Sequence, residues 1–211
     1  ENFFDPSKYD AGVVRRELKL DNDFIYLFFG RPGITKGLNH LIDAVPLISE
    51  KIPKSRFLAI VSKGKSYRKN RKEMLMQIDN LDRKHNGLKI KERIKIIDEV
   101  PFERLPYYLK AADCVVVPSL TEGFGLAAAE ASLMEKLIVA SKTGSLPEVI
   151  GAARNPIRGI LVKPGNPEDI ARGVVDIFNG KGKMYHKDLF TLKRQVSDYS
   201  KLIIDLTNGS I

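Results

Sequence analysis

The segment Pro118-Ser119-Leu120-Thr121-Glu122-Gly123-Phe124-Gly125-Leu126-Ala127-Ala128-Ala129-Glu130-Ala131 decides the fold that this sequence predicts. It follows an apolar run, Cys114 to Val117, that is typical of a buried strand, and its alanines begin a predicted helix. In an open parallel α/β sheet, such a turn borders the crevice where ligands bind. Its two glycines have no Cβ to obstruct a ligand, and the first N–H groups of the helix favour an anion. The segment therefore predicts a phosphate site, in which Glu122 and Glu130 can reach opposite ends of one bound molecule.

Apolar runs and helical periodicity alternate along the rest of the chain. The expected strands are residues 24–29, 57–61, 94–97, 114–117, 137–140 and 159–162. The expected helices are residues 13–20, a segment starting at 38, a basic segment within 67–95, then 102–112, 125–135 and 167–179. Strict alternation predicts an α/β fold with a Rossmann-like, doubly wound parallel sheet and right-handed crossovers. We expect residues 1–20 to form a linker and lead-in helix, residues 21–182 one Rossmann-like domain, and residues 183–211 a polar tail helix.

Composition places the chain among globular proteins of a reducing compartment. Its 211 residues fit one large domain or a small pair, and 43% hydrophobic residues suffice for a core. The sequence has no apolar run long enough to span a membrane, and residues 1–6 lack the pattern of a secretion signal. The single cysteine, Cys114, lies in an apolar strand and is interpreted as a core thiol. These features predict a cytoplasmic protein without disulfides or a metal cluster.

The net charge of +9 favours anionic partners such as nucleotide phosphates, nucleic acid or an acidic membrane face. Much of the excess lies in residues 67–95, where Met74, Ile78 and Leu81 recur at helical spacing. The ordinary explanation is an amphipathic helix with a solvated basic face. Aromatic residues that could stack on bases do not interleave with these charges, so we expect no nucleic-acid partner, and a basic nucleic-acid binder remains a less favoured alternative.

A second loop provides cations for the predicted phosphate site. The first strand ends at Gly30 and is followed by Arg31 and Lys36, which are placed to neutralise a diphosphate from the side opposite the glycines at 123 and 125. No P-loop pattern occurs. Residues 123–128 satisfy the loose Gly-x-Gly-x-x-Ala pattern of a dinucleotide site, but such a fingerprint normally follows the first strand, not the fourth. An NAD-binding domain therefore remains a weaker alternative.

These motifs together resemble the donor-binding, C-terminal domain of family 4 retaining glycosyltransferases of the GT-B fold, the glycosyl transferases group 1. The first loop and helix resemble those of the family from Gly30-Arg31 and Lys36-Gly37 onward. Glu122 and Glu130, separated by seven residues, resemble its acidic signature. The segments 143–148 and 159–165 resemble its sugar-proximal loop and closing turn, and residues 2–6 its interdomain linker. Two departures are Ser145, where a second Gly is usual, and residues 62–65, where a Gly-x-Gly turn is common.

The resemblance implies a role for each residue. Arg31 and Lys36 would hold the donor diphosphate and stabilise the charge on the leaving group. Glu122 would contact hydroxyls of the transferred sugar, and Glu130 would accept the two ribose hydroxyls. The implied catalytic set is Glu122, Arg31 and Lys36, and the implied donor-binding set is Gly30, Arg31, Lys36, Gly123, Phe124, Gly125, Leu126 and Glu130. Alternatively, Arg31 and Lys36 are ordinary loop charges, and Glu122 is an acid stabilised by the helix dipole.

The implied reaction is metal-independent, retaining transfer of a hexose, such as mannose, from a UDP- or GDP-sugar to an acceptor in glycan biosynthesis. It requires no cofactor, since the nucleotide sugar is a substrate. The acceptor site would lie on an N-terminal GT-B domain missing from this sequence, against which the tail helix would pack. Without that domain we expect little or no activity, and any peripheral contact with the cytosolic membrane face would be made through it. A non-catalytic nucleotide-sugar module is the main alternative.

Overall fold

The computed structural model describes residues 3–64, 67–151, 159–182 and 192–207. Outside these ranges lie the first two residues of the expected linker, Lys65 of the 62–65 segment, and residues 183–191 and 208–211 of the expected tail helix.

Six parallel strands form one sheet in the order β3-β2-β1-β4-β5-β6. This order confirms the predicted doubly wound α/β fold. The first connections run outward from β1 in one direction and the later ones outward from β4 in the other, so the order reverses between these two neighbouring strands. The bounds are β1 Phe24–Gly30, β2 Ser55–Val61, β3 Ile94–Asp98, β4 Cys114–Val117, β5 Leu137–Ser141 and β6 Gly159–Val162.

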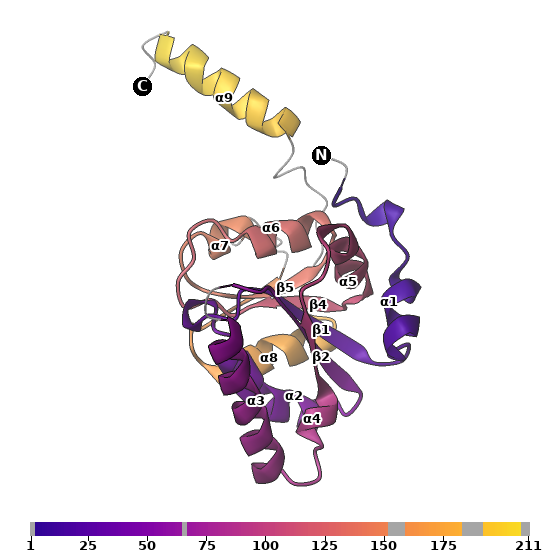
Figure 1. Ribbon diagram of the computed structural model, residues 1–211. Helices are drawn as coiled ribbons and strands as arrows, with labels where there is room; N and C mark the ends of the chain where they lie inside the picture. The colour runs from indigo at the N-terminus through magenta and orange to yellow at the C-terminus, as the bar shows by residue number, and fades with distance from the viewer. Residues whose placement is uncertain (1–2, 65–66, 152–158, 183–191, 208–211) are drawn as a thin grey trace.

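Helices cover both faces of the sheet (Figure 1). Helices α2, α3, α4 and α8 lie on one face, and α1, α5, α6 and α7 on the other. Their bounds are α1 Ala11–Leu18, α2 Leu38–Lys51, α3 Tyr67–Lys84, α4 Ile90–Arg93, α5 Leu105–Ala111, α6 Leu126–Leu133, α7 Leu146–Val149 and α8 Pro167–Phe178. The described residues also contain three 3₁₀ turns: η1 Pro6–Lys8 before α1, η2 Ile34–Lys36 between β1 and α2, and η3 Phe102–Arg104 between β3 and α5.

One predicted helix begins later than expected. The segment 102–112 was predicted to be helical throughout, but it starts as η3 and becomes α-helical only at Leu105. Pro106 is the second residue of α5, and proline suits the first turn of an α-helix because it has no N–H to leave unpaired there. The proline therefore favours a new helix start at this point.

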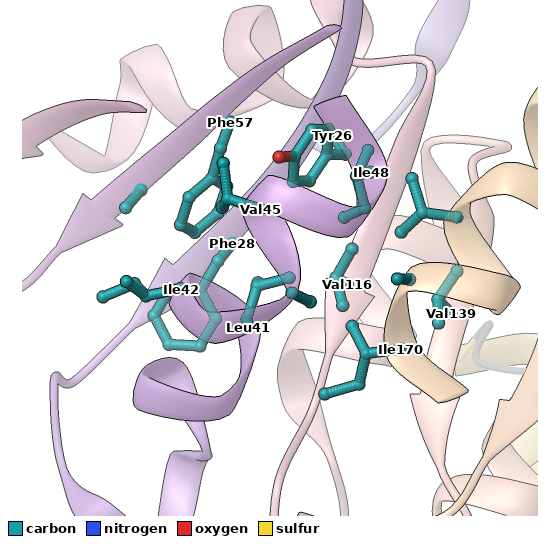
Figure 2. Packing of buried hydrophobic residues seen from close by; sticks show 14 of the residues in the cluster. Tyr26, Phe28, Leu41, Ile42, Val45, Ile48, Phe57, Val116, Val139 and Ile170 are labelled. Carbon is teal, nitrogen blue, oxygen red and sulfur yellow. The ribbon is translucent and has the colours of Figure 1, made fainter. Parts of the chain in front are cut away.

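Alternating strand residues build two hydrophobic cores. Tyr26 and Phe28 of β1 pack toward α2 and α8, while the intervening Ile25 and Leu27 face α5 and α6. Figure 2 shows the first core, where the ring of Tyr26 stacks on Phe57 of β2 with the centroids 5.3 Å apart. Because both faces are covered, the strands read as continuous apolar runs. The helices cover the two faces of the sheet but not the carboxyl ends of its strands.

The tail forms helix α9, Leu192–Thr207, which stands away from the sheet and its covering helices in Figure 1. Several of its apolar side chains are exposed, including Tyr199 at 66% and Leu206 at 60%. Among the described residues, no helix combines the length and apolar character needed to cross a membrane.

Candidate functional site

A pocket of about 430 Å³ opens at the carboxyl ends of β1 and β4. This is the point where the strand order reverses, and loops there diverge to opposite sides of the sheet and leave a crevice. All of the predicted site residues except Gly123 line this pocket, namely Gly30, Arg31, Lys36, Glu122, Phe124, Gly125, Leu126 and Glu130. Gly123 lies in the same turn, and an added Cβ there would meet no atom within 4 Å. The structure thus brings together two loops that lie about 90 residues apart in the sequence.

The two loops are joined by an ion pair inside the pocket. Lys36 Nζ lies 2.7 Å from Glu122 Oε2, with the side chains 31% and 12% exposed. Ser119 Oγ donates to the same carboxylate oxygen at 3.1 Å, and Ser119 itself is buried. Glu122 Oε1 has no hydrogen-bond partner among the described residues. The carboxylate is therefore held through one oxygen and presents the other.

Arg31 differs from Lys36 in being exposed at the mouth of the pocket. Its guanidinium makes no ion pair with any side chain in the described ranges. A guanidinium can donate two parallel hydrogen bonds to a phosphate. The Arg31 guanidinium is thus available to bind an anionic ligand.

The N-terminus of α6 faces the pocket from the β4 side. Gly125 is its cap residue and adds no side-chain hydrogen bond. The N–H groups of Ala128 and Ala129 donate hydrogen bonds to the carbonyl of Gly125, whereas those of Leu126 and Ala127 have no partner among the described residues. Unpaired N–H groups at the positive end of a helix favour an anion, so this edge of the pocket complements the cations on the opposite side.

Glu130 lies one turn further into α6 and is partly buried at the pocket wall. Its side-chain carboxylate has no hydrogen-bond or ion-pair partner within the described part of the chain. Burial raises the pKa of its carboxyl group, because the charged form loses solvation that nothing replaces. An unpaired, partly buried carboxylate is costly, and hydrogen-bond donors on a ligand would offset that cost.

A third loop after β5 supports the turn from behind. Thr143 Oγ1 donates to the carbonyl of Leu120 at 3.1 Å. Ser145 Oγ lies 2.6 Å from the carbonyl oxygen of Gly123 and 2.7 Å from that of Phe124. Between them, Gly144 has φ +50°, and a Cβ at this position would lie 1.9 Å from the carbonyl oxygen of Glu122. The loop can approach this closely only because residue 144 is glycine.

The sequence analysis placed Ser119 in the glycine turn and Thr143 and Ser145 in the expected sugar-proximal loop, but it gave none of the three a role in the site. Ser145 was recognised only as a departure from the family pattern, and its hydroxyl makes contacts that glycine could not make. Ser119 could have been found as a small polar residue just after a buried strand, three residues before Glu122. The part of the chain that the structure describes contains no group of three or more His, Cys, Asp or Glu side chains placed to hold a metal ion.

Comparison of the sequence with known proteins gives consistent results. The family model described as glycosyl transferases group 1 matches residues 13–188. An uncharacterised glycosyltransferase of Methanocaldococcus jannaschii is 32% identical over 162 residues, which cover 77% of this chain and 37% of that protein. A D-inositol 3-phosphate glycosyltransferase of Thermobifida fusca is 32% identical over 159 residues, which cover 74% of this chain and 35% of that protein. The chain therefore aligns with less than half the length of these relatives.

Solved structures show the same fold. The Anabaena protein HepE in complex with UDP is 26% identical and has a TM-score of 0.70, covering 85% of this chain and 46% of HepE. A sucrose-phosphate synthase of Thermosynechococcus elongatus is 23% identical and has a TM-score of 0.72, covering 97% of this chain and 51% of the synthase. The Rossmann-like sheet of GT-B glycosyltransferases is thus confirmed as the fold class. With the match to the family model over most of its length, the chain belongs to the glycosyl transferases group 1 family.

Proposed function

We propose that this chain binds a nucleoside diphosphate sugar and is the donor-binding, C-terminal half of a retaining family 4 glycosyltransferase. The observation that carries the proposal is the pocket itself, which is lined both by Arg31 and Lys36 and by the N-terminus of α6, whose first N–H groups have no partner among the described residues. Cations on one wall and helix N–H groups on the other are the chemistry that a diphosphate requires. UDP is one candidate because HepE, which is 26% identical to this chain, was solved in complex with UDP, and GDP is the other.

Each residue has a proposed task. Arg31 and Lys36 neutralise the diphosphate and stabilise the charge that grows on it as the sugar leaves, so no metal ion or cofactor takes part. Glu130 accepts the ribose hydroxyls, which supply the donors that its carboxylate lacks. Glu122 accepts a hydroxyl of the transferred hexose through Oε1 and holds the sugar for attack on the face that the leaving group departs from. Retention of the anomeric configuration follows from that geometry.

The rest of the enzyme is proposed to lie in a preceding GT-B domain with the acceptor site. The alignments support this, since they cover less than half of each relative. The exposed apolar side chains of α9 offer a surface that such a domain would cover. We propose a cytoplasmic enzyme of glycan biosynthesis whose contact with a membrane surface, where one exists, belongs to the preceding domain. Mannose is one candidate for the transferred sugar.

The proposal is tested by thermal shift with UDP, GDP, ADP, their sugars and NAD. We expect stabilisation by UDP or GDP and by their sugars, and a much smaller shift in Glu130→Ala. Glu168→Ala, which changes an exposed acid in the first turn of α8, is the matched control and keeps the full shift. Stabilisation by NAD alone would support a dinucleotide site instead, and no shift with any ligand would contradict the proposal.

A non-catalytic nucleotide-sugar module is the second candidate, because the pocket alone supports binding. It differs from the enzyme in that the N-terminal domain would not catalyse sugar transfer. A full-length protein that binds the donor but neither hydrolyses nor transfers its sugar to any acceptor would favour the module.

A nucleic-acid binder is less favoured, since two of the cations in α3 already have acidic partners, Arg71 with Asp98 and Lys69 with Glu73. Such a binder would show a steep salt dependence with RNA or DNA that Arg31→Ala leaves unchanged.

A further inference from the structure

Lys36 and Glu122 form an ion pair with each other in the structure, but in the proposed donor complex they contact different parts of the ligand. In the structure the ammonium and the carboxylate neutralise each other at 2.7 Å. In the donor complex proposed above, Lys36 turns to the diphosphate and Glu122 to the sugar. A ligand that enters the pocket must therefore displace or share an existing ion pair.

The loops that carry the pair are fastened to each other by their backbones. Leu120 N–H donates to the carbonyl of Thr35 at 2.8 Å. Gly37 approaches the carbonyl of Pro118 so closely that a Cβ would lie 2.0 Å from its oxygen. These contacts lie on both sides of Lys36 in the sequence. With the two backbones held together, the pair can rearrange by rotation of the side chains alone, and Glu122 would stay near the diphosphate in the complex proposed above.

Glu122 also has a second anchor that does not depend on Lys36. The hydroxyl of buried Ser119 donates to Oε2, the oxygen that Lys36 contacts. When Lys36 turns toward a phosphate, Ser119 keeps the carboxylate in place with Oε1 facing the pocket. The negative charge of Glu122 is thereby retained beside the bound ligand.

A donor and its product differ in charge at this position. In a nucleotide sugar the distal phosphate is a diester with one negative charge and the sugar offers hydroxyl donors. Transfer of the sugar leaves a terminal phosphate that carries close to two charges at neutral pH, because its second ionisation lies near pH 6. A fixed carboxylate nearby is repelled more strongly by the product than by the donor, and only the donor supplies hydroxyls to Oε1.

We propose that Glu122 discriminates between donor and product: its carboxylate competes with the terminal phosphate of the product for Lys36, and thereby weakens product binding and speeds product release. The inference rests on the proposed function, since it assumes that the diphosphate binds beside Lys36. Ser119 is a positioning residue that holds the carboxylate during the exchange.

Isothermal titration of the 211-residue chain with UDP, GDP, UDP-glucose and GDP-mannose tests the inference. Glu122→Gln keeps the size of the side chain and removes its charge. We expect it to bind the preferred nucleoside diphosphate about fivefold more tightly than the wild type, and its sugar no more tightly. Glu122→Ala is the second variant and should shift the diphosphate affinity in the same direction. Circular dichroism and the melting temperature establish that each variant is folded.

Two controls separate this effect from net charge and from loop packing. Glu17→Gln makes the same change in another ion pair, Glu17 with Arg104, which lies outside the pocket lining, and should leave the affinity unchanged. Ser119→Ala keeps the charge of Glu122 and should not tighten diphosphate binding. Equal or weaker diphosphate binding by both Glu122 variants, with normal binding by the wild type, would overturn this inference alone. Failure of the wild type to bind any of the four ligands would overturn the proposed function as well.

Discussion

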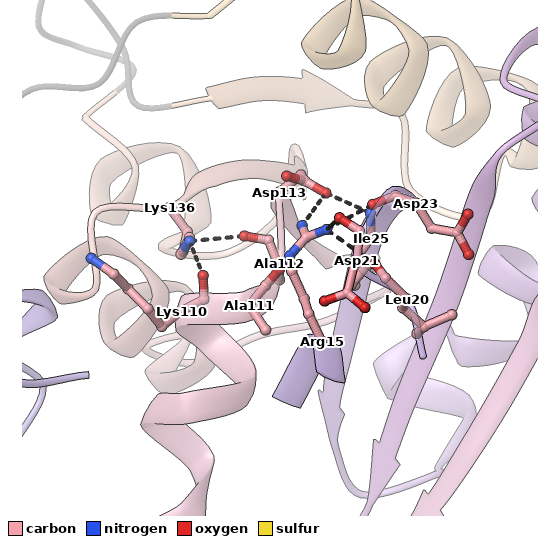
Figure 3. A network of polar contacts seen from close by, with 10 residues as sticks. All are labelled: Arg15, Leu20, Asp21, Asp23, Ile25, Lys110, Ala111, Ala112, Asp113 and Lys136. Carbon is pink, nitrogen blue, oxygen red and sulfur yellow. Dashed lines mark hydrogen bonds and ion pairs between the residues drawn. The ribbon is translucent and has the colours of Figure 1, made fainter. Parts of the chain in front are cut away.

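Arg15 and Asp113 stand 98 residues apart in the sequence and form an ion pair with 2.8 Å between Nη2 and Oδ2 (Figure 3). The same carboxylate oxygen accepts the N–H of Ile25 at 2.6 Å. The guanidinium also donates to the carbonyls of Ala111 at 3.0 Å and Asp23 at 2.9 Å. Helix α1 is thereby fastened to the amino ends of β1 and β4, at the edge of the sheet opposite the pocket.

Removal of the Asp113 carboxylate should destabilise the fold. Asp113→Ala leaves the Ile25 N–H without an acceptor and the guanidinium without its anion, so we expect the free energy of unfolding to fall by about 2 kcal/mol. Urea denaturation measures this change. Glu17→Gln disrupts a more exposed ion pair on the same helix and should cost no more than about 1 kcal/mol. Equal losses in the two variants would show that the bond from Asp113 to the Ile25 N–H adds nothing to stability.

Lys136 should make stability depend on pH in the alkaline range. Its ammonium donates to the carbonyls of Lys110 and Ala112 at 2.7 and 2.8 Å, and burial lowers its pKa to about 8 (Figure 3). An unfolded lysine has a pKa of about 10.4, so between these values the unfolded chain binds more protons. The contribution of Lys136 to the free energy of unfolding therefore rises with pH across this window.

The comparison between the wild type and Lys136→Met isolates this group. The wild type should gain stability relative to the variant between pH 7.5 and pH 10, as measured by urea denaturation at each pH. Lys142→Met, which changes an exposed lysine at the other end of β5, serves as the control and should follow the wild type. Parallel curves for the wild type and Lys136→Met would contradict the prediction.

Nucleotide affinity should weaken in acid through Glu130. Burial raises the pKa of its carboxyl group, and ribose hydroxyls donate to the ionised form, so binding of the nucleotide should lower that pKa again. Affinity for UDP or GDP is expected to fall as the pH drops through the pKa of the free protein. In Glu130→Gln the phosphate of the nucleotide still titrates, but the contribution of the Glu130 carboxyl group to the pH dependence of affinity is removed. Titration calorimetry at several pH values should give a shallower slope for the variant, and identical slopes would contradict the role.

Ser145 should contribute to binding through the shape of the turn. Ser145→Gly removes the hydroxyl that contacts the carbonyls of Gly123 and Phe124, so the glycine turn loses a support. We expect nucleotide affinity to fall about three- to tenfold, equivalent to one hydrogen bond, with a small change in melting temperature. Ser145→Thr keeps a hydroxyl and should retain most of the affinity. If Ser145→Gly binds as well as the wild type, the hydroxyl has no part in preorganising the site.

The sequence predicted the strands and the identity of the pocket residues better than it predicted their contacts. Every expected strand is present, because buried parallel strands leave a continuous apolar run that can be recognised locally. Arg31, Lys36, Glu122 and Glu130 could be assigned to one pocket because the carboxyl ends of parallel strands share an edge. The contacts of Ser119 and Thr143 were not predicted, since they depend on how the turn at Glu122 is folded and on which carbonyl it brings near Thr143.

The sequence by itself determined the alternation of strands and helices, the glycine turn before α6 and the cations after β1, because these depend on local periodicity and residue type. Only the tertiary structure decided that Lys36 pairs with Glu122. That contact requires β1 and β4, which are separated by two strands in the chain, to lie side by side in the sheet. It also requires their loops to be joined by the hydrogen bond between Leu120 and Thr35. Strand order is set by the packing of helices on both faces, which sums many weak apolar contacts across the whole domain.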